Sequence, residues 1–230
     1  MNFTGRALPI LFNTDMVLAI LENRKTSTRR AVRYKYNNTE MKMRTDKYGT
    51  RLIEIQKDIE GETHGKLPDG RTWHKLLGYI EKNSPYRKGD TLYVRETWGE
   101  WTGGYLYKAW AGPCTQPGQS AVMKWRPSIH MPKEAARIFL KVTDVRAEQL
   151  QDITKEQILM EGGSRDAIRH YMAQMPENTE KYVRAAYLIE WQHIWDSTVK
   201  KAELGYYGWD ANPWVWVIEF DRIDKLGECE

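Results

Sequence analysis

The segment from Glu22 to Arg30, which joins a predicted helix to a predicted strand, constrains the fold of this chain more than any other. Apolar residues recur at helical spacing over residues 14–22, after a capping Asn13 or Thr14. Residues 26–33 are rich in β-branched side chains, which favour an extended strand. The chain therefore passes from helix to strand within a few residues, and this segment carries a lysine, two threonines and three arginines.

Lys25 and Thr28 give this segment a chemistry of its own. A lysine at such a junction can point into a cleft, and a nearby threonine hydroxyl becomes a nucleophile when a base accepts its proton. The arginines around them would hold an anionic or planar ligand. Because side chains alternate along a strand, Lys25 and Thr28 reach one cleft only if Lys25 lies before the strand begins. A solvated basic turn is the alternative interpretation.

The composition indicates a folded protein and argues against several classes. A chain of 230 residues can form one elaborated domain or two small ones, and its 41% hydrophobic residues provide a core. No apolar run approaches the roughly 18 residues of a membrane span, and Ala7–Phe12 is too short for a secretory signal. The distant Cys114 and Cys229 indicate no disulfide framework, so we expect the reducing cytoplasm. The histidines lack metal-ligand spacing, and we expect no metal, cofactor or membrane partner.

Positive charge is concentrated in one part of the sequence. The net charge is +4, but residues 24–51 contain ten basic and two acidic residues, so this segment carries +8 and the rest of the chain −4. Tyr34, Tyr36 and Tyr48 lie between the basic residues. Such a mixture is typical of surfaces that bind phosphates and stack bases, and equally of an ordinary basic hairpin on a protein surface.

The rest of the chain predicts several short strands and few helices around one core. Strand signals lie at 51–55, 91–98, 105–110, 135–145 and 214–220. A short helix over 153–161 begins with a capping box of Thr154 and Gln157, and a long helix covers 179–200. This order predicts an α+β fold, a small mixed or antiparallel, partly open β-barrel with flanking helices. We expect one domain, with insertions near residues 37–86 and 162–211.

Five segments occur in an order that resembles a known family. They are Arg24-Lys25-Thr26-Ser27-Thr28-Arg29-Arg30 and residues 89–96, 136–145, 150–162 and 214–220. Together they resemble the ASCH family of the PUA-like superfamily, whose Lys-Thr-x-Thr-x-Arg signature the first segment matches. Residues 125–132 and 212–216 look like the long versions that bacteriophages and prophages carry.

The resemblance implies a PUA-like barrel whose cleft binds RNA or a modified nucleoside. Small bacterial members hydrolyse the amide of N4-acetylcytidine with a lysine, a threonine and a glutamate, which fall by motif on Lys25, Thr28 and Glu161. Thr28 would attack the amide, and Lys25 would accept its proton if burial lowers the lysine pKa. Glu161 would orient the lysine or protonate the leaving amine. A static salt bridge between Lys25 and Glu161 is the alternative.

Further residues are candidates for holding the ligand. They are Arg24, Thr26, Arg30, Arg95, Glu96, Trp98, Trp125 and Trp214. Arg30 or a backbone N–H would face the oxyanion. Arg95 and Glu96 either line the cleft or form an ion pair, and the tryptophans either stack on a base or belong to the core. Three functions stay open: an amidohydrolase of N4-acylated cytidine, a non-catalytic RNA-binding module, and a phage factor that binds a host protein.

Overall fold

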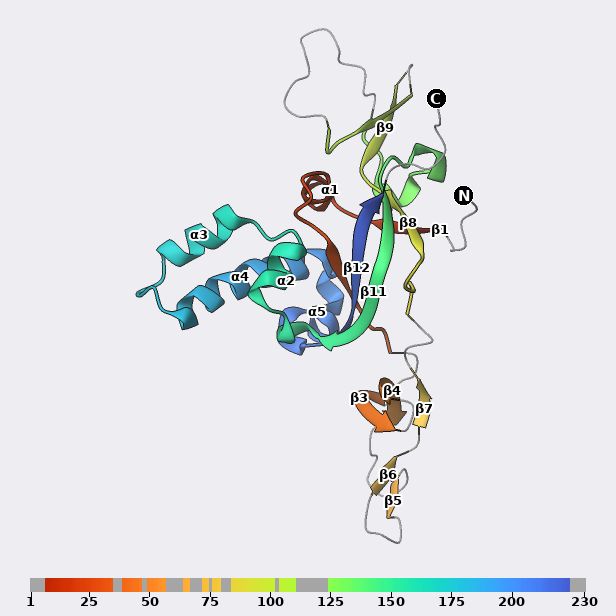
Figure 1. The fold of residues 1–230 in the computed structure, drawn as a ribbon, viewed down its shortest axis with the longest axis vertical. Helices are drawn as coiled ribbons and strands as arrows, with labels where there is room; N and C mark the ends of the chain where they lie inside the picture. Colours follow the sequence, from red (N-terminus) through yellow and green to blue (C-terminus); the bar gives the residue numbers. More distant parts are fainter. Residues whose placement is uncertain are drawn as a thin grey trace.

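One five-stranded sheet organises the protein (Figure 1), seen in a computed structural model. The structure describes residues 7–34, 39–46, 49–56, 64–66, 72–74, 76–79, 84–101, 104–110 and 124–223. The strand order is β1 (Ala7–Leu11), β8 (Thr91–Arg95), β11 (Phe139–Gln149), β12 (Trp214–Ile223) and β2 (Ser27–Ala31). Strands β1 and β8 are parallel, and the other pairs are antiparallel.

The two longest strands, β11 and β12, lie side by side in the middle of the sheet. Side chains alternate between the faces of a strand, so β12 contributes to two separate cores. Val215 and Val217 pack against the helices, whereas Trp216, Ile218 and Phe220 belong to the core on the other face. The strand predicted over 214–220 is thereby confirmed, and both of its faces are buried.

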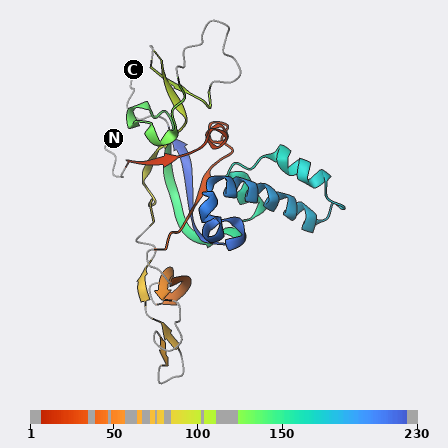
Figure 2. The same ribbon diagram turned by 180° about the vertical axis from the view of Figure 1, so that it is seen from behind.

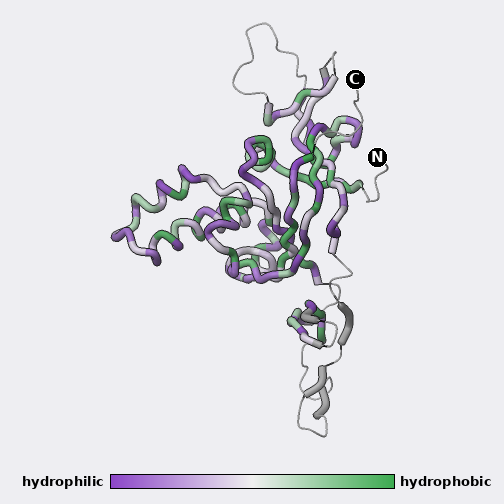
Figure 3. Tube along the Cα trace, in the orientation of Figure 1, coloured by the Kyte–Doolittle hydropathy of each residue, from purple (hydrophilic) through white to green (hydrophobic). Residues whose placement is uncertain are grey.

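Helices connect β11 to β12 and cover one face of the sheet (Figure 2). They are α2 (Lys155–Met160), α3 (Arg165–Ala173), α4 (Glu180–Thr198) and α5 (Leu204–Tyr207), with short 3-10 turns at Leu150–Asp152, Lys201–Glu203 and Trp209–Ala211. Trp191 and Trp195 of α4 pack against Ile153 and the β12 valines. Helices α3 and α4 project together from the sheet and are largely hydrophilic away from it (Figure 3). Within the described ranges, none of the helices has the length and apolar character needed to cross a membrane.

Helix α1 (Thr14–Leu21) packs on the opposite face of the sheet. The Asn13 side chain caps it by accepting a hydrogen bond from the Met16 N–H at 2.9 Å. Val17 and Ile20 are buried in the same core as Ile218 of β12. The helix predicted over 14–22 is thus confirmed, and it ends before the strand begins at Ser27, as the segment between them suggested.

The sheet is curled but does not close into a barrel. Strands β1 and β2 form its two edges and share no ladder of hydrogen bonds. One side chain bridges them: Arg30 Nη2 donates to the Leu11 carbonyl at 2.9 Å, and its guanidinium lies 5.3 Å from the centre of the Phe12 ring. The structure therefore confirms the predicted α+β class with flanking helices. The main sheet is curled and open, and it is not a closed barrel.

Smaller sheets lie outside the main one (Figure 1). They comprise β3 (Thr39–Asp46), β4 (Gly49–Gln56) and β7 (Leu76–Tyr79), then β5 (His64–Lys66) with β6 (Thr72–His74), and β9 (Trp98–Trp101) with β10 (Gly104–Tyr107). Strand β4 corresponds to the prediction over 51–55. Two 3-10 turns, Ser128–His130 and Lys133–Ala135, precede β11. Trp98 is buried beside the second of these turns, in contact with Met131 and Ala135.

A glycine ends helix α2 and lets three segments approach each other closely. The predicted capping box of Thr154 and Gln157 is present at the start of α2. At its end, Gly162 has φ +96°, a conformation that L side chains rarely adopt. A Cβ atom here would lie 3.1 Å from the Ala19 Cβ and 3.6 Å from the Lys25 Cβ.

We therefore expect Gly162→Ala to lower the free energy of unfolding by about 1–2 kcal/mol, because a left-handed conformation is strained for alanine. Chemical denaturation would measure this. Gly205→Ala is the matched control, since that glycine lies in α5 and a Cβ added there would meet open space. The control should leave stability unchanged or slightly raised. Equal losses in both variants would contradict the role assigned to Gly162.

Candidate functional site

A cleft of about 740 Å³ opens between the edge strand β2 and the end of helix α4. Its volume lies in the range of small-molecule binding sites. Phe12, Arg30 and Tyr86 contribute to one wall, and Thr198 and Tyr207 contribute to the other. The cleft therefore combines aromatic rings with a cation at an edge of the main sheet.

Arg30 is the most unusual side chain of this cleft. Its Nη2 donates to the Leu11 carbonyl at 2.9 Å, its Nη1 donates to the Arg29 carbonyl at 3.4 Å, and its guanidinium stacks near Phe12. Within the described ranges, no carboxylate pairs with it. Burial lowers the pKa of Arg30, yet a guanidinium starts from so high a pKa that it stays charged at neutral pH.

The outer rim of the cleft carries further cations. Arg33 Nη2 donates to Glu203 Oε2 at 3.0 Å, and its guanidinium lies 5.0 Å from the centre of the Tyr207 ring. Lys200 lies 3.8 Å from the same glutamate. The Glu203 carboxylate is thus shared by the exposed Arg33 and Lys200. These three side chains leave the rim with a net positive charge, in addition to the charge of Arg30.

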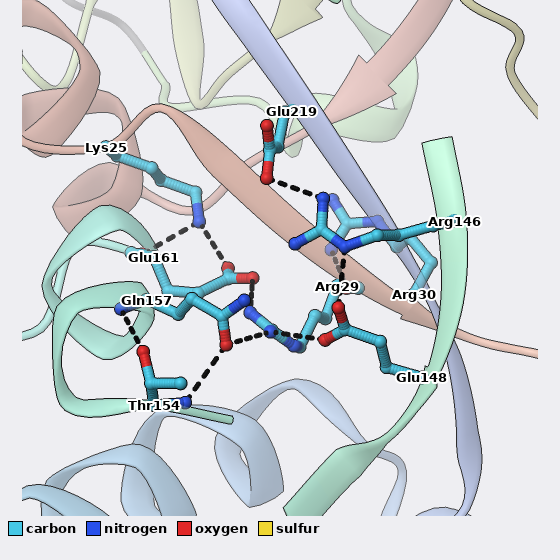
Figure 4. A network of polar contacts seen from close by, with 9 residues as sticks. All are labelled: Lys25, Arg29, Arg30, Arg146, Glu148, Thr154, Gln157, Glu161 and Glu219. Carbon is cyan, nitrogen blue, oxygen red and sulfur yellow. Dashed lines mark hydrogen bonds and ion pairs between the residues drawn. The ribbon is translucent and has the colours of Figure 1, made fainter. Parts of the chain in front are cut away.

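A buried cluster of charges lies behind β2, centred on Glu161 (Figure 4). Lys25 Nζ donates to Glu161 Oε2 at 2.9 Å and to the Glu161 carbonyl at 2.8 Å. Arg29 Nη1 donates to Glu161 Oε1 at 3.0 Å. All three side chains are almost completely buried. Both carboxylate oxygens of Glu161 are therefore occupied by cations.

The cluster continues along the sheet through Arg29. Its Nη2 donates to Glu148 Oε2 and to Gln157 Oε1, both at 3.1 Å. Glu148 in turn accepts from Arg146 Nε at 2.6 Å, and Arg146 Nη1 also donates to Glu219 Oε1 at 2.6 Å. Figure 4 shows this chain of contacts crossing from α2 to β11 and β12. The cluster is a connected network in which most charges have partners of opposite sign.

Burial and pairing shift the ionisation of Lys25 and Glu161. Burial lowers the pKa of Lys25, and the neighbouring Glu161 carboxylate offsets this only in part. Burial alone would raise the pKa of Glu161, but Lys25 and Arg29 outweigh it and hold that pKa below its ordinary value. Glu161 is consequently ionised at neutral pH, and the proton on Lys25 is held less tightly than on an ordinary lysine.

Thr28 lies beside this cluster in a narrow recess. The recess has a volume of about 10 Å³, near the lower limit for one water molecule, and its lining includes Thr28, Glu161 and Trp195. Thr28 is buried, and its hydroxyl makes no hydrogen bond within the described part of the chain. Lys25 lies before the start of β2. This position is the one that the alternation of side chains requires if Lys25 and Thr28 are to reach one cleft. The structure brings Lys25 to Glu161 and Thr28 to the recess that Glu161 also lines.

Among the residues predicted to hold a ligand, Arg30 lines the cleft and the others lie elsewhere. Glu96 is buried and forms a bidentate ion pair with Arg137, at 2.9 and 3.0 Å. Arg95 donates to the Met131 and Ile129 carbonyls. These two predicted residues therefore stabilise the region around β8, and they do not pair with each other.

The remaining predicted ligand residues also have structural neighbours. Arg24 is exposed and pairs with Glu22, and the Thr26 N–H donates to the Met160 carbonyl. Trp98 is in the small core under β9, and Trp214 packs against the main core. Trp125 is half-buried, next to the residue that bridges to Trp98.

The sequence did not single out most residues of the cleft. Phe12, Tyr86 and Tyr207 come from segments that carry no local motif, and two of these segments were assigned to insertions. Arg33 and Lys200 looked like ordinary surface cations. The available signal was the excess of basic and tyrosine residues near Arg33, which pointed to the right region without identifying its partners.

Comparison with known proteins leaves the interpretation to this geometry. No family model, no curated protein and no solved structure matches the chain.

We expect Glu161→Gln to lower the free energy of unfolding by about 3–5 kcal/mol at pH 7, because it leaves buried Lys25 and Arg29 without their shared counter-charge. The effect should depend on pH. Since the pKa of Glu161 is below its ordinary value, its stabilisation is complete above about pH 4.3 and is lost as pH falls toward the folded-state pKa. The gap between wild type and variant should therefore narrow in acid.

Denaturant titrations from pH 7 down to pH 3 would measure this gap. Glu22→Gln is the control, since Glu22 forms an exposed pair with Arg24 and should contribute little. A Glu161→Gln variant as stable as the wild type at pH 7 would show that the cluster is not needed for folding.

Proposed function

We propose that the cleft binds a nucleotide unit of RNA or a modified nucleoside. The observation that carries this proposal is Arg30, a cation held in the cleft wall by backbone carbonyls without a carboxylate partner among the described residues. A guanidinium has five N–H donors, and the two bonds that it makes here leave others available to an anion. An anionic ligand would supply the missing counter-charge.

The rest of the cleft suits the other parts of a nucleotide. The half-buried Tyr86 and Tyr207 bring aromatic rings to the cleft lining, where a base would stack, and base–aromatic stacking tolerates any base. Phe12 is buried and packs against Arg30 instead. Arg33 and Lys200 at the rim would attract neighbouring phosphates of a polymer. A purely apolar ligand would leave these cations without a role.

The family resemblance supports the same proposal. The order of motifs from Lys25 to the last strand resembles the ASCH family, for which a cleft that binds RNA or a modified nucleoside is expected. We interpret the curled sheet, with its edges brought together by Arg30 and Leu11, as an open PUA-like barrel. The helical segment between β11 and β12 is then an elaboration that builds one wall of the cleft.

We expect Arg30→Met to weaken binding of a labelled single-stranded RNA octamer and of cytidine monophosphate about tenfold or more, because charge-assisted hydrogen bonds are lost. Fluorescence anisotropy and competition would measure it. Arg24→Met is the matched control, since Arg24 is exposed outside the cleft. Binding of the octamer by wild type should also weaken steeply with added salt. If neither probe binds the wild type, the proposal fails.

A second candidate function is hydrolysis of N4-acylated cytidine. The observation that favours it is the combination of Lys25, whose pKa burial lowers, with Thr28, whose hydroxyl has no partner among the described residues. Thr28 Oγ1 would attack the amide carbon while Lys25, in its neutral amine form, accepts the hydroxyl proton and passes it to the leaving N4 amine. Water would then release acetate from the threonine ester. Glu161, hydrogen-bonded to Lys25, would orient the lysine.

This reaction places a demand on helix α4. The acyl group must reach Thr28 through the recess, which at about 10 Å³ is too small to hold it. Trp195 and Thr198 border both the recess and the cleft. A shift of these two side chains would join the two spaces and admit an acyl group.

We expect Thr28→Val to abolish release of cytidine from N4-acetylcytidine, since valine keeps the shape of threonine and lacks the nucleophile. Chromatography of the products would measure turnover, and circular dichroism would confirm the fold. Ser197→Ala, a cleft residue outside the lysine–threonine–glutamate set, is the control and should keep full activity. A wild-type protein without turnover on any acylated cytosine would rule out this function.

A further inference from the structure

The cleft is bordered by a free edge of the main sheet. Among the strands that the structure describes, β2 pairs with β12 alone. Two hydrogen bonds fix which of its backbone groups face β12: the Val32 N–H donates to the Trp214 carbonyl, and the Phe220 N–H donates to the Thr26 carbonyl, both at 2.9 Å. Because backbone direction alternates along a strand, the polar groups of residues 28 and 30 face β12.

The backbone groups of Arg29 and Ala31 therefore point away from β12. No backbone group in the described ranges bonds them, and the Arg29 carbonyl accepts only a long bond of 3.4 Å from Arg30 Nη1. Arg29 is buried and Ala31 is half-buried. Backbone N–H and C=O groups in such places nearly always have partners, so these groups are suited to hydrogen-bond a ligand in the cleft.

The accessible length of this edge indicates what the partner is. Residues 29–31 line the cleft, but Ser27 and Thr28 do not, because the space narrows there to the recess under Trp191 and Trp195. Strand β2 ends at Ala31, so within the strand only Arg29 and Ala31 face outward into the cleft. An added peptide strand usually spans three residues or more, so it would have to continue past β2 along Arg33. The backbone groups of Arg29 and Ala31 present alternating hydrogen-bond acceptors and donors, which match the edge of one nucleobase.

The side chains around the edge favour the same partner. Arg30 belongs to this segment and has no carboxylate partner among the described residues, and Phe12 lies beneath its guanidinium. A base at the edge of β2 would thus have a cation for its phosphate and aromatic rings nearby. A neutral peptide would use the backbone groups but not the charge.

We infer that the ligand is an unpaired nucleotide whose Watson–Crick edge hydrogen-bonds to the backbone of Arg29 and Ala31. This inference rests on the proposed function and deepens it. A duplex has its Watson–Crick edges occupied, so it cannot make these contacts. The protein should therefore select single-stranded over double-stranded RNA, through backbone groups that every substitution except proline leaves in place.

The test uses the full chain and measures amide hydrogen exchange by NMR, with and without the single-stranded octamer. In the free protein, the Arg29 and Ala31 amides should exchange faster than those of Thr28 and Arg30. Binding should slow the first two at least about tenfold. The same sequence presented as a duplex should bind at least about tenfold more weakly in direct titrations, and it should leave these amides unprotected.

Ala31→Pro provides an independent measurement. Proline removes the outward N–H and is tolerated on an edge strand, so the fold should persist while affinity for the octamer falls about tenfold or more. Arg24→Met, at an exposed residue outside the cleft, is the control and should bind like wild type. If the proline variant unfolds, the amide exchange of Arg29 and Ala31 in the wild type still tests the inference.

The outcomes separate this inference from the proposed function. If the wild type binds neither the octamer nor cytidine monophosphate, the proposed function fails and the inference fails with it. If the octamer binds but the two amides are not protected, the inference is overturned and the proposed function stands. Protection by an extended acidic peptide instead of RNA would also overturn it, in favour of strand addition.

Discussion

The buried carboxylate of Glu161 is the constraint on which the rest of the site depends. A carboxylate removed from water is costly unless cations and hydrogen-bond donors compensate it. Here the compensation comes from Lys25 in the turn after α1 and from Arg29 in β2, while Glu161 itself caps the end of α2. Three segments distant in the sequence must therefore come together before any of these charges is satisfied.

Fixing Arg29 also fixes its neighbours. Arg29 is anchored by Glu161 at the end of α2 and by the Trp191 ring of α4. Because successive residues of a strand point to opposite faces, the side chains of Thr28 and Arg30 leave β2 on the other face. The buried cluster thus positions Arg30 in the cleft through the backbone of β2, without itself touching a ligand. The helical connection between β11 and β12 then supplies the second wall, with Trp195 separating the cleft from the deeper recess.

Local patterns predicted much of this fold, and long-range pairing accounts for most of the remainder. Helix α1, the capping box at Thr154 and the final strand follow from spacing and capping, which are local properties. Strand β1 carries no alternation, contains Pro9 and becomes a strand by pairing with β8, which no local pattern encodes. Helix α3 is nine residues long and lies inside a segment treated as an insertion.

The same division holds for the site. Lys25, Thr28, Arg30 and Glu161 were identified from the sequence, and the contact of Lys25 with Glu161 is present. The importance of Arg29 was missed, because a single arginine in a basic run gives no sign that it is completely buried. Tyr86 and Tyr207 could not be assigned to a common cleft either, since their proximity to β2 arises from the path of the whole chain.

The position of β2 has a consequence for how the protein is made. Synthesis produces residues 27–31 long before β12, which is their only strand partner among the described residues. Until β12 leaves the ribosome, the nascent chain holds a short basic strand with both edges open and an arginine that lacks its buried surroundings. Closing so long a loop costs entropy and slows folding. The cleft therefore forms only after the whole segment from β2 to β12 has been translated.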